Sequence, residues 1–119
     1  MKRAWKITGW YVFALGILHT VLGVFLTWEG IVEMWEAGVV NSVASIGANA
    51  AFWFMFMGFF FIYIGWHWQE LIKRTGQPLS KFTAWGMTIL TLFGMVFVPF
   101  SGFILMLPLS LIMLWPHLA

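Results

Sequence analysis

The chain has very little charge, and this shortage limits the class of protein it can be. Only 8% of its 119 residues are charged, whereas roughly a quarter are charged in an ordinary soluble domain. Hydrophobic residues make up 62% of the sequence, and there are only six Lys or Arg and four acidic residues. So few charges cannot give a core of this size a water-facing surface, and we expect most of the outer surface to face lipid.

The chain also lacks cysteine. This absence excludes disulfide frameworks, thiolate metal sites and cysteine nucleophiles, and it leaves the redox state of the compartment open. The net charge of +2 comes from a few basic residues close to the expected helix ends. Nucleic acid is therefore not an expected partner.

Four apolar runs dominate the sequence, and we expect membrane spans at 7–28, 50–72, 80–98 and 101–116. The first two are long enough to cross a hydrocarbon core of about 30 Å, and the last two need flanking residues to do so. A Pro-Phe-Ser-Gly segment separates the last two runs, which predicts either a tight helical hairpin or one broken, re-entrant segment. The preferred fold is all-α: one membrane domain over 1–119, a four-transmembrane-helix bundle with a short amphipathic outer segment between the first two helices.

The basic residues indicate how the spans are oriented. They precede the first span or lie between the second and third: Lys2, Arg3, Lys6, Lys73, Arg74 and Lys81. The positive-inside rule predicts a multi-pass protein of the cell (inner) membrane with both termini in the cytoplasm. The segment after the first span has no Lys or Arg, and we expect it to be the outer loop.

Small residues recur at intervals of seven along the first two spans. Such residues let helix backbones approach closely in membranes, so both series predict packing seams, in this chain or in a homo-oligomer or membrane complex. The first series is Gly9, Gly16, Gly23 and Gly30, and the second is Ala51, Gly58 and Gly65.

His19 lies near the middle of the first span, one turn from Gly16 and from Gly23. An ionisable ring at membrane depth marks a functional site, or it satisfies a buried hydrogen bond and fixes the helix register. Histidine titrates near neutral pH and its neutral ring binds metals, so proton transfer, ligand binding and cofactor ligation are all open. We expect His19 to face the interior.

One face of the second span combines large aromatic rings with polar groups, and it could line a pocket for a flat apolar ligand together with His19. The same rings could instead settle at the membrane interface without any ligand. At about 1.5 Å per residue, His19 lies about 2 Å from the midplane and His67 about 9 Å towards the cytoplasm, which argues against a haem between them. The candidate residues on this face are Asn49, Trp53, Phe56, Phe60, Tyr63 and His67.

Three carboxylates, Glu29, Glu33 and Glu36, share one face of the expected outer segment, and apolar side chains as far as Val39 share the other. We interpret the carboxylates as a solvated face of an interfacial helix, with a weak divalent-cation site as the alternative. His117 lies in the tail and is expected to be exposed to solvent.

Two short segments, Gly-Ile-Leu-His-Thr-Val-Leu-Gly at 16–23 and Asn-Ala-Ala-Phe-Trp-Phe at 49–54, with Gly58, carry a family resemblance. They resemble small bacterial four-helix membrane proteins of the DoxX-like group. This resemblance implies a four-helix membrane fold. It also implies a role that involves membrane redox complexes and quinones. It supplies no catalytic motif.

The preferred functional class is an accessory or ligand-binding membrane protein that accommodates an apolar molecule, a quinone or a lipid, near His19. The first alternative is a proton-coupled small-molecule transporter that uses His19 as its proton carrier. The second is a membrane enzyme that acts on a lipid or isoprenoid with His19 as general acid or base.

Overall fold

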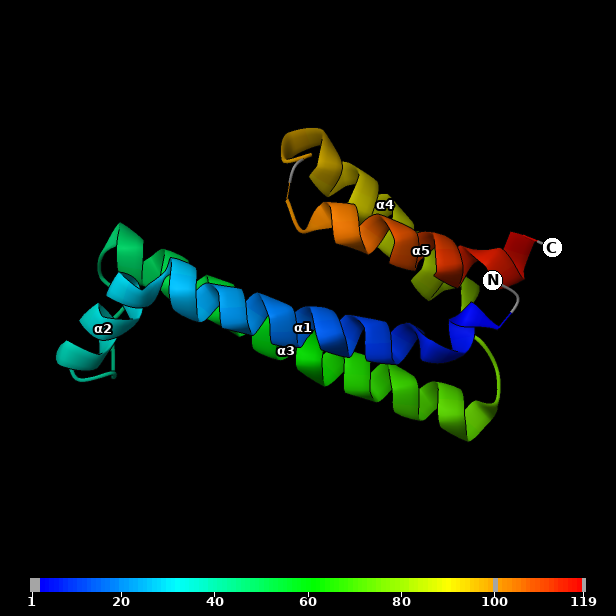
Figure 1. Cartoon of the computed structure of the whole chain (residues 1–119), viewed down its shortest axis with the longest axis horizontal. Coiled ribbons are helices and arrows are strands. Elements are labelled where there is room, and N and C mark those ends of the chain that lie inside the picture. The colour runs from blue at the N-terminus through cyan, green and yellow to red at the C-terminus, as the bar shows by residue number, and fades with distance from the viewer. Residues whose placement is uncertain (1–2, 100, 119) are drawn as a thin grey trace. The chain divides into compact units, whose positions relative to one another are not determined.

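Helices account for most of the chain. The computed structural model describes residues 3–99 and 101–118, and within these ranges it contains five α-helices, one short 3-10 helix and no strand. The helices follow one another as η1 (Ala4–Ile7), α1 (Thr8–Leu26), α2 (Trp28–Glu36), α3 (Ile46–Thr75), α4 (Lys81–Phe97) and α5 (Phe103–Leu118). The expected all-α class is confirmed (Figure 1).

Each of the four expected ranges overlaps one helix, and the ends of that helix lie within a few residues of the expected ends. The last two ranges form two separate helices that contact each other. The length and composition of two segments, Ala4–Leu26 and Ile46–Thr75, would let them cross a membrane. The helices α4 and α5 are also apolar, but they are shorter.

The turn between α3 and α4 follows from local sequence. Gly76 ends α3 with a φ of 66°, a left-handed conformation that glycine adopts without strain, and its N–H donates to the carbonyl of Ile72 over 2.8 Å. The Ser80 side chain then accepts a hydrogen bond from the Thr83 N–H at 3.2 Å and caps the start of α4. Gly76 therefore ends one helix, and Ser80 starts the next.

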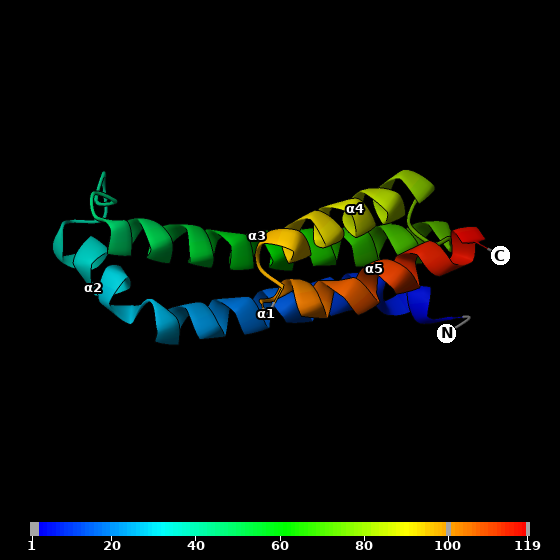
Figure 2. The same ribbon diagram turned by 90° about the horizontal axis from the view of Figure 1, so that it is seen from above.

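The chain forms two compact units, and α1 and α3 contribute to both. The terminal unit comprises Met1–Tyr11 and Trp66–Ala119, and the central unit comprises Val12–Gly65. In the terminal unit, α4 and α5 pack side by side and the end of α5 reaches η1 (Figure 1, Figure 2). The central unit holds most of α1, all of α2 and the first two thirds of α3.

In the terminal unit, side chains tie the helix ends together. The Gln69 amide donates to the carbonyl of Lys6 over 2.8 Å and accepts from the Trp10 N–H at 3.1 Å, so it satisfies backbone groups at the start of α1. The Tyr11 hydroxyl donates to the Leu105 carbonyl over 2.6 Å. His117 is half-buried, with its Nε2 2.8 Å from the Leu79 carbonyl oxygen, whereas exposure to solvent was expected.

In the central unit, α1 and α3 run antiparallel with their backbones in close approach. A Cβ added to Gly16 would lie 2.6 Å from the Ile62 nitrogen, and one added to Gly23 would lie 2.8 Å from the Met55 sulfur. Gly23 follows Gly16 by seven residues in α1, and its partner Met55 precedes Ile62 by seven residues in α3, as expected for antiparallel helices. At Gly16 the missing side chain lets the backbones of α1 and α3 approach closely, and at Gly23 it leaves space for the side chains of Met55 and Phe54.

Candidate functional site

His19 contributes its ring to an aromatic cluster between α1 and α3 in the central unit. The ring is half-buried and stacks on Phe54, with centroids 4.0 Å apart and an angle of 9° between the planes. The edge contact with Phe61 has a centroid distance of 5.9 Å and an angle of 71°. Gly23 leaves the space beside Phe54, because a Cβ there would lie 2.8 Å from the Phe54 ring.

The sequence did not identify the two rings that touch His19. Phe54 and Phe61 are seven residues apart and alternate with the small residues Ala51, Gly58 and Gly65 at intervals of three and four. This spacing puts them on the same side of α3 as the small residues. The sequence therefore contains the spacing that places Phe54 and Phe61 beside the small residues. This spacing predicts contact with His19 only once the small residues are known to face α1.

The aromatic residues expected to surround His19 lie elsewhere on α3. In the central unit the exposed fractions are 55% for Trp53, 47% for Phe56, 47% for Phe60 and 69% for Tyr63. These side chains point outward, away from the seam with α1, and Trp53 makes edge contacts with its neighbour Phe56. The structure thus does not bring this face of α3 together with His19.

The remaining two residues of that face also lie apart from the histidine cluster. Asn49 is exposed and lines a hollow of about 340 Å³ at the start of α3, with Ser45 and Ile46. His67 is exposed and belongs to the terminal unit.

All the glycines of the predicted seams are buried, and most of them meet a backbone or side chain closely. In the terminal unit, Gly9 faces the backbone of Gln69. In the central unit, Gly30 faces the carbonyl of Gly47, and Gly58 faces Thr20. Gly65 is buried as well. Within each unit these contacts are made inside the chain, so these faces are already occupied.

The α2 helix anchors to the start of α3 through one of its three carboxylates. The Ser45 hydroxyl donates to Glu33 Oε2 over 2.8 Å and accepts from the Ala48 N–H at 3.0 Å, so Ser45 caps α3 while Glu33 holds the cap. Glu29 and Glu36 are exposed. Among the residues described, no three His, Cys, Asp or Glu side chains gather closely enough to bind a metal ion.

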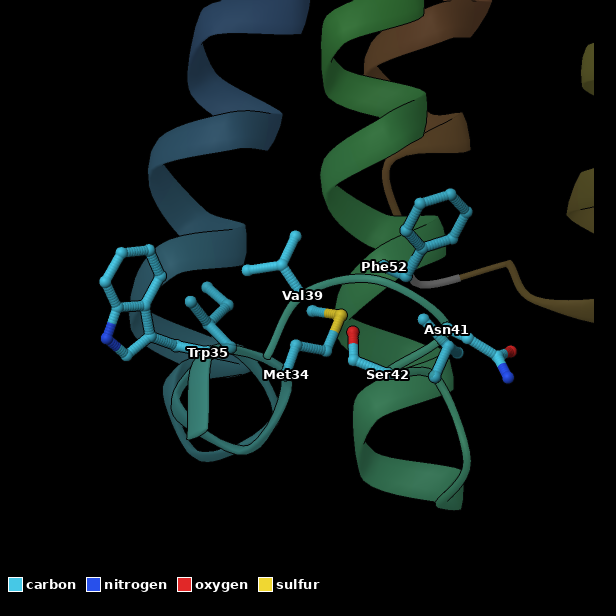
Figure 3. A pocket seen from close by; sticks show the side chains of 8 residues that line it. Met34, Trp35, Val39, Asn41, Ser42 and Phe52 are labelled. Atoms are coloured by element: carbon cyan, nitrogen blue, oxygen red, sulfur yellow. The ribbon is translucent and has the colours of Figure 1, made fainter. Parts of the chain in front are cut away.

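A groove of about 510 Å³ opens between α2, the loop after it and the first turns of α3, all in the central unit (Figure 3). Figure 3 shows Met34 and Val39 between the rings of Trp35 and Phe52, with the Asn41 amide turned away from them. We call this feature the α2 groove, and it is lined by Ile31, Met34, Trp35, Val39, Asn41, Ser42, Val43 and Phe52.

The loop beside the α2 groove has an unusual backbone. Val39 and Asn41 have φ values of 69° and 53°, which is the left-handed region, and Val39 is β-branched and poorly suited to it. The helix ends at Glu36, so the expectation that the helical face continues to Val39 was wrong. Strained residues of this kind gather at binding sites, where the surrounding structure holds them in place.

The α2 groove was not predicted from the sequence as a site. Its residues come from three segments of the chain. Five of the eight side chains carry no nitrogen or oxygen atom: Ile31, Met34, Val39, Val43 and Phe52. The volume falls within the range of about 300–1,000 Å³ that is usual for small-molecule sites. The arrangement can hold an apolar group, with Asn41 and the buried Ser42 as polar residues of its lining.

A protein-family model matches almost the whole chain. It is described as a family of unknown function (DUF6463), and the match extends over residues 3–119. No curated protein and no solved structure matches the chain.

Proposed function

The chain belongs to this family of unknown function, and we propose that it is a membrane-embedded protein that binds an apolar molecule, a lipid or a quinone, in the α2 groove. The observation that carries the proposal is the groove itself, because it combines an apolar lining with a volume suited to an acyl chain or a quinone ring. It lies in the segment that joins the two longest apolar helices.

The exposure of the long helices supports a membrane location. Only 22% of the apolar window of the first segment and 17% of the second are buried, whereas the core helix of a soluble protein is mostly buried. Phe25 and Leu26 at the end of α1 are 77% and 71% exposed. Exposed apolar area on this scale needs lipid or a partner to cover it.

Four spans with both termini in the cytoplasm are part of the proposal. The helices α4 and α5 have 17 and 16 residues, and at about 1.5 Å per residue they extend over roughly 24–26 Å, slightly less than a typical hydrocarbon core. The distribution of Lys and Arg along the sequence supports the orientation. The α2 helix then lies at the outer interface, with its carboxylates in water.

A homo-oligomer, a membrane-complex partner and the likeness to DoxX-like proteins remain predictions. Since Gly16 and Gly23 are occupied by α3 of the same chain, an oligomer would use other apolar faces, such as the outward rings of α3. The DoxX-like resemblance favours a quinone over other ligands of the groove.

Photo-crosslinking tests the proposed function. Membranes containing the protein are incubated with a diazirine-bearing fatty acid or a diazirine-bearing quinone, and the crosslinked residues are identified by mass spectrometry. We expect saturable crosslinks at Met34, Trp35 and Phe52 that an excess of the unlabelled compound prevents. Crosslinks spread evenly over the exposed apolar residues and insensitive to competition would contradict a site in the α2 groove.

A matched pair of variants sharpens the test. Phe52→Ala removes an aromatic wall of the groove, and Phe93→Ala removes a phenylalanine ring from α4, in the other unit, where the ring is 64% exposed compared with 38% for Phe52. We expect the first change to weaken competition by the unlabelled compound and the second to leave it unchanged. Equal behaviour of the two variants would argue for non-specific partition into the protein surface.

Proton-coupled transport is the second candidate function, and the half-buried position of His19 halfway along α1 supports it. This function requires flux of a substrate that depends on a proton gradient and is lost in His19→Gln. An enzyme that uses His19 would instead form a new product from an added lipid or isoprenoid.

A further inference from the structure

We propose that the cationic end of the terminal unit binds the phosphate groups of anionic phospholipids. This end comprises η1, the end of α3, the start of α4 and the end of α5. The inference rests on the proposed membrane location, and it concerns a different ligand and a different unit from the α2 groove.

The two units divide the charges of the chain almost completely. The terminal unit contains all six Lys and Arg residues and one acidic residue, Glu70. The central unit contains three acidic residues and no Lys or Arg. A surface of one charge sign on one unit attracts an anionic partner to that unit alone.

Contacts within the terminal unit bring the cationic segments to one end. The Gln69 amide bonds to the carbonyl of Lys6, and Lys73 follows Gln69 by one helical turn. The ring of His117, near the end of α5, contacts the Leu79 carbonyl, two residues before Lys81. Figure 2 shows the end of α5 and the turn between α3 and α4 at this end of the unit.

The cationic side chains are free to face a membrane surface. Arg3, Lys6, Lys73, Arg74 and Lys81 are all exposed. The last two residues of α3 before Thr75 are Lys73 and Arg74, so their charges also lie favourably at the C-terminus of a long helix. Lys and Arg at such helix ends extend their charged groups towards the lipid headgroups.

Tryptophan rings border these cations and indicate the depth of the interface. Trp10 and Trp66 meet edge to face with centroids 5.6 Å apart, and they are 45% and 57% exposed. Lys6 Nζ lies 5.8 Å from the centre of the Trp5 ring. Because indole rings settle at the level of the headgroups, cations just beyond them reach the lipid phosphates. This arrangement favours a membrane surface over a nucleic acid as the anionic partner.

Native mass spectrometry of the detergent-solubilised full chain tests the inference. The protein is titrated with phosphatidylglycerol, with phosphatidylcholine and with inorganic phosphate. We expect phosphatidylglycerol to bind at least about tenfold more tightly than phosphatidylcholine, since each juxtamembrane cation contributes about fivefold. Equal binding of the two lipids would overturn the inference, and so would inorganic phosphate binding as tightly as the anionic lipid.

Two triple variants assign the effect to the cationic end. K73Q/R74Q/K81Q removes three of the six charges and should reduce the preference several-fold, since each lost cation contributes about fivefold. K73R/R74K/K81R keeps the charges and should retain the preference. Unfolding curves of both variants show whether the fold is intact. A preference that the neutral variant retains in full while its unfolding midpoint is unchanged would overturn the inference.

The membrane location is checked separately by extraction of cell membranes with alkaline carbonate. A protein that stays in the membrane but shows no lipid preference contradicts only this inference. A protein that is released into the carbonate supernatant contradicts the proposed function as well.

Discussion

Gly16 shows how the absence of one side chain determines how closely two helices can pack. A Cβ at this position would lie 2.6 Å from the Ile62 nitrogen and 2.8 Å from its Cγ1, so either the backbone or the side chain would have to move. We expect Gly16→Val to lower the free energy of unfolding by about 1–3 kcal/mol, which is typical of overpacked sites. Thermal unfolding in detergent measures the change.

The control for this substitution is Gly86 in α4. A Cβ there meets nothing within 4 Å, so Gly86→Ala adds no clash and replaces a poor helix former. We expect the unfolding midpoint of this variant to stay unchanged or to rise. A similar loss of stability in both variants would mean that glycine is needed for some reason other than close packing.

At His19, ring stacking and proton chemistry make different predictions. His19→Phe keeps a flat ring against Phe54 and loses both ring nitrogens, while His19→Ala loses the stacking contact as well. If His19 contributes mainly ring stacking, His19→Phe leaves the unfolding midpoint unchanged. His19→Ala then lowers the free energy of unfolding by about 0.5–1.5 kcal/mol more than the loss of buried apolar area alone would. Unfolding curves of the two variants, measured side by side, make this comparison.

The result at His19 also bears on function. Normal stability together with lost ligand binding or lost flux in His19→Phe would assign the ring nitrogens a functional role. Normal stability with normal function would leave His19 as a packing residue of the α1 and α3 seam.

At the scale of an element, one carboxylate of α2 is hydrogen-bonded to the residue that caps α3. Glu33 accepts a hydrogen bond from the Ser45 cap of α3, and Glu36 on the same helix is exposed at its last residue. We expect Glu33→Ala to increase amide hydrogen exchange at residues 37–48 and to weaken crosslinking in the α2 groove. Glu36→Ala should change neither, because it leaves the link to α3 intact.

This comparison has a clear contrary result. If the two substitutions raise exchange equally, net charge rather than the Glu33 to Ser45 hydrogen bond determines the order of the loop. Ser45→Ala would then also leave the exchange pattern unchanged.

At the scale of the whole molecule, the absence of cysteine makes the proposed topology directly testable. Single cysteines can be introduced at Val40, which is 85% exposed in the loop after α2, and at Gln77, which is exposed in the turn after α3. We expect a membrane-impermeant maleimide added to intact cells to label Val40→Cys and to leave Gln77→Cys unlabelled. In inverted vesicles the pattern should reverse.

Labelling of both positions from the same side would contradict the proposed orientation. It would mean that α3 does not cross the membrane, since both positions flank this helix. Four spans further require that the segment at 98–102 be labelled from the same side as Val40.

The helices of this chain could be predicted well from the sequence because their signals are local. Long apolar runs, the glycine at position 76 and the serine at position 80 decide where helices begin and end through the backbone conformation of adjacent residues. The same holds for α2, where apolar and acidic residues alternate with a helical period between Trp28 and Glu36.

The faces of those helices could not be chosen in the same way. A helix that is apolar all round has no periodic signal to separate its inner face from its outer face. The second span therefore offered two inner faces, one with small residues and one with Trp53, Phe56 and Phe60. In the central unit the small residues lie inside, because only they allow α3 to meet the glycines of α1.

The sequence by itself determined the helical class, the approximate helix ends and the concentration of positive charge in two segments, since each depends on composition or on neighbours in the chain. Tertiary structure decided the partners of His19 and the existence of the α2 groove. Both depend on side chains from segments more than ten residues apart, such as His19 with Phe54 and Met34 with Phe52. Contacts of this kind arise from how helices pack, and no local pattern specifies them.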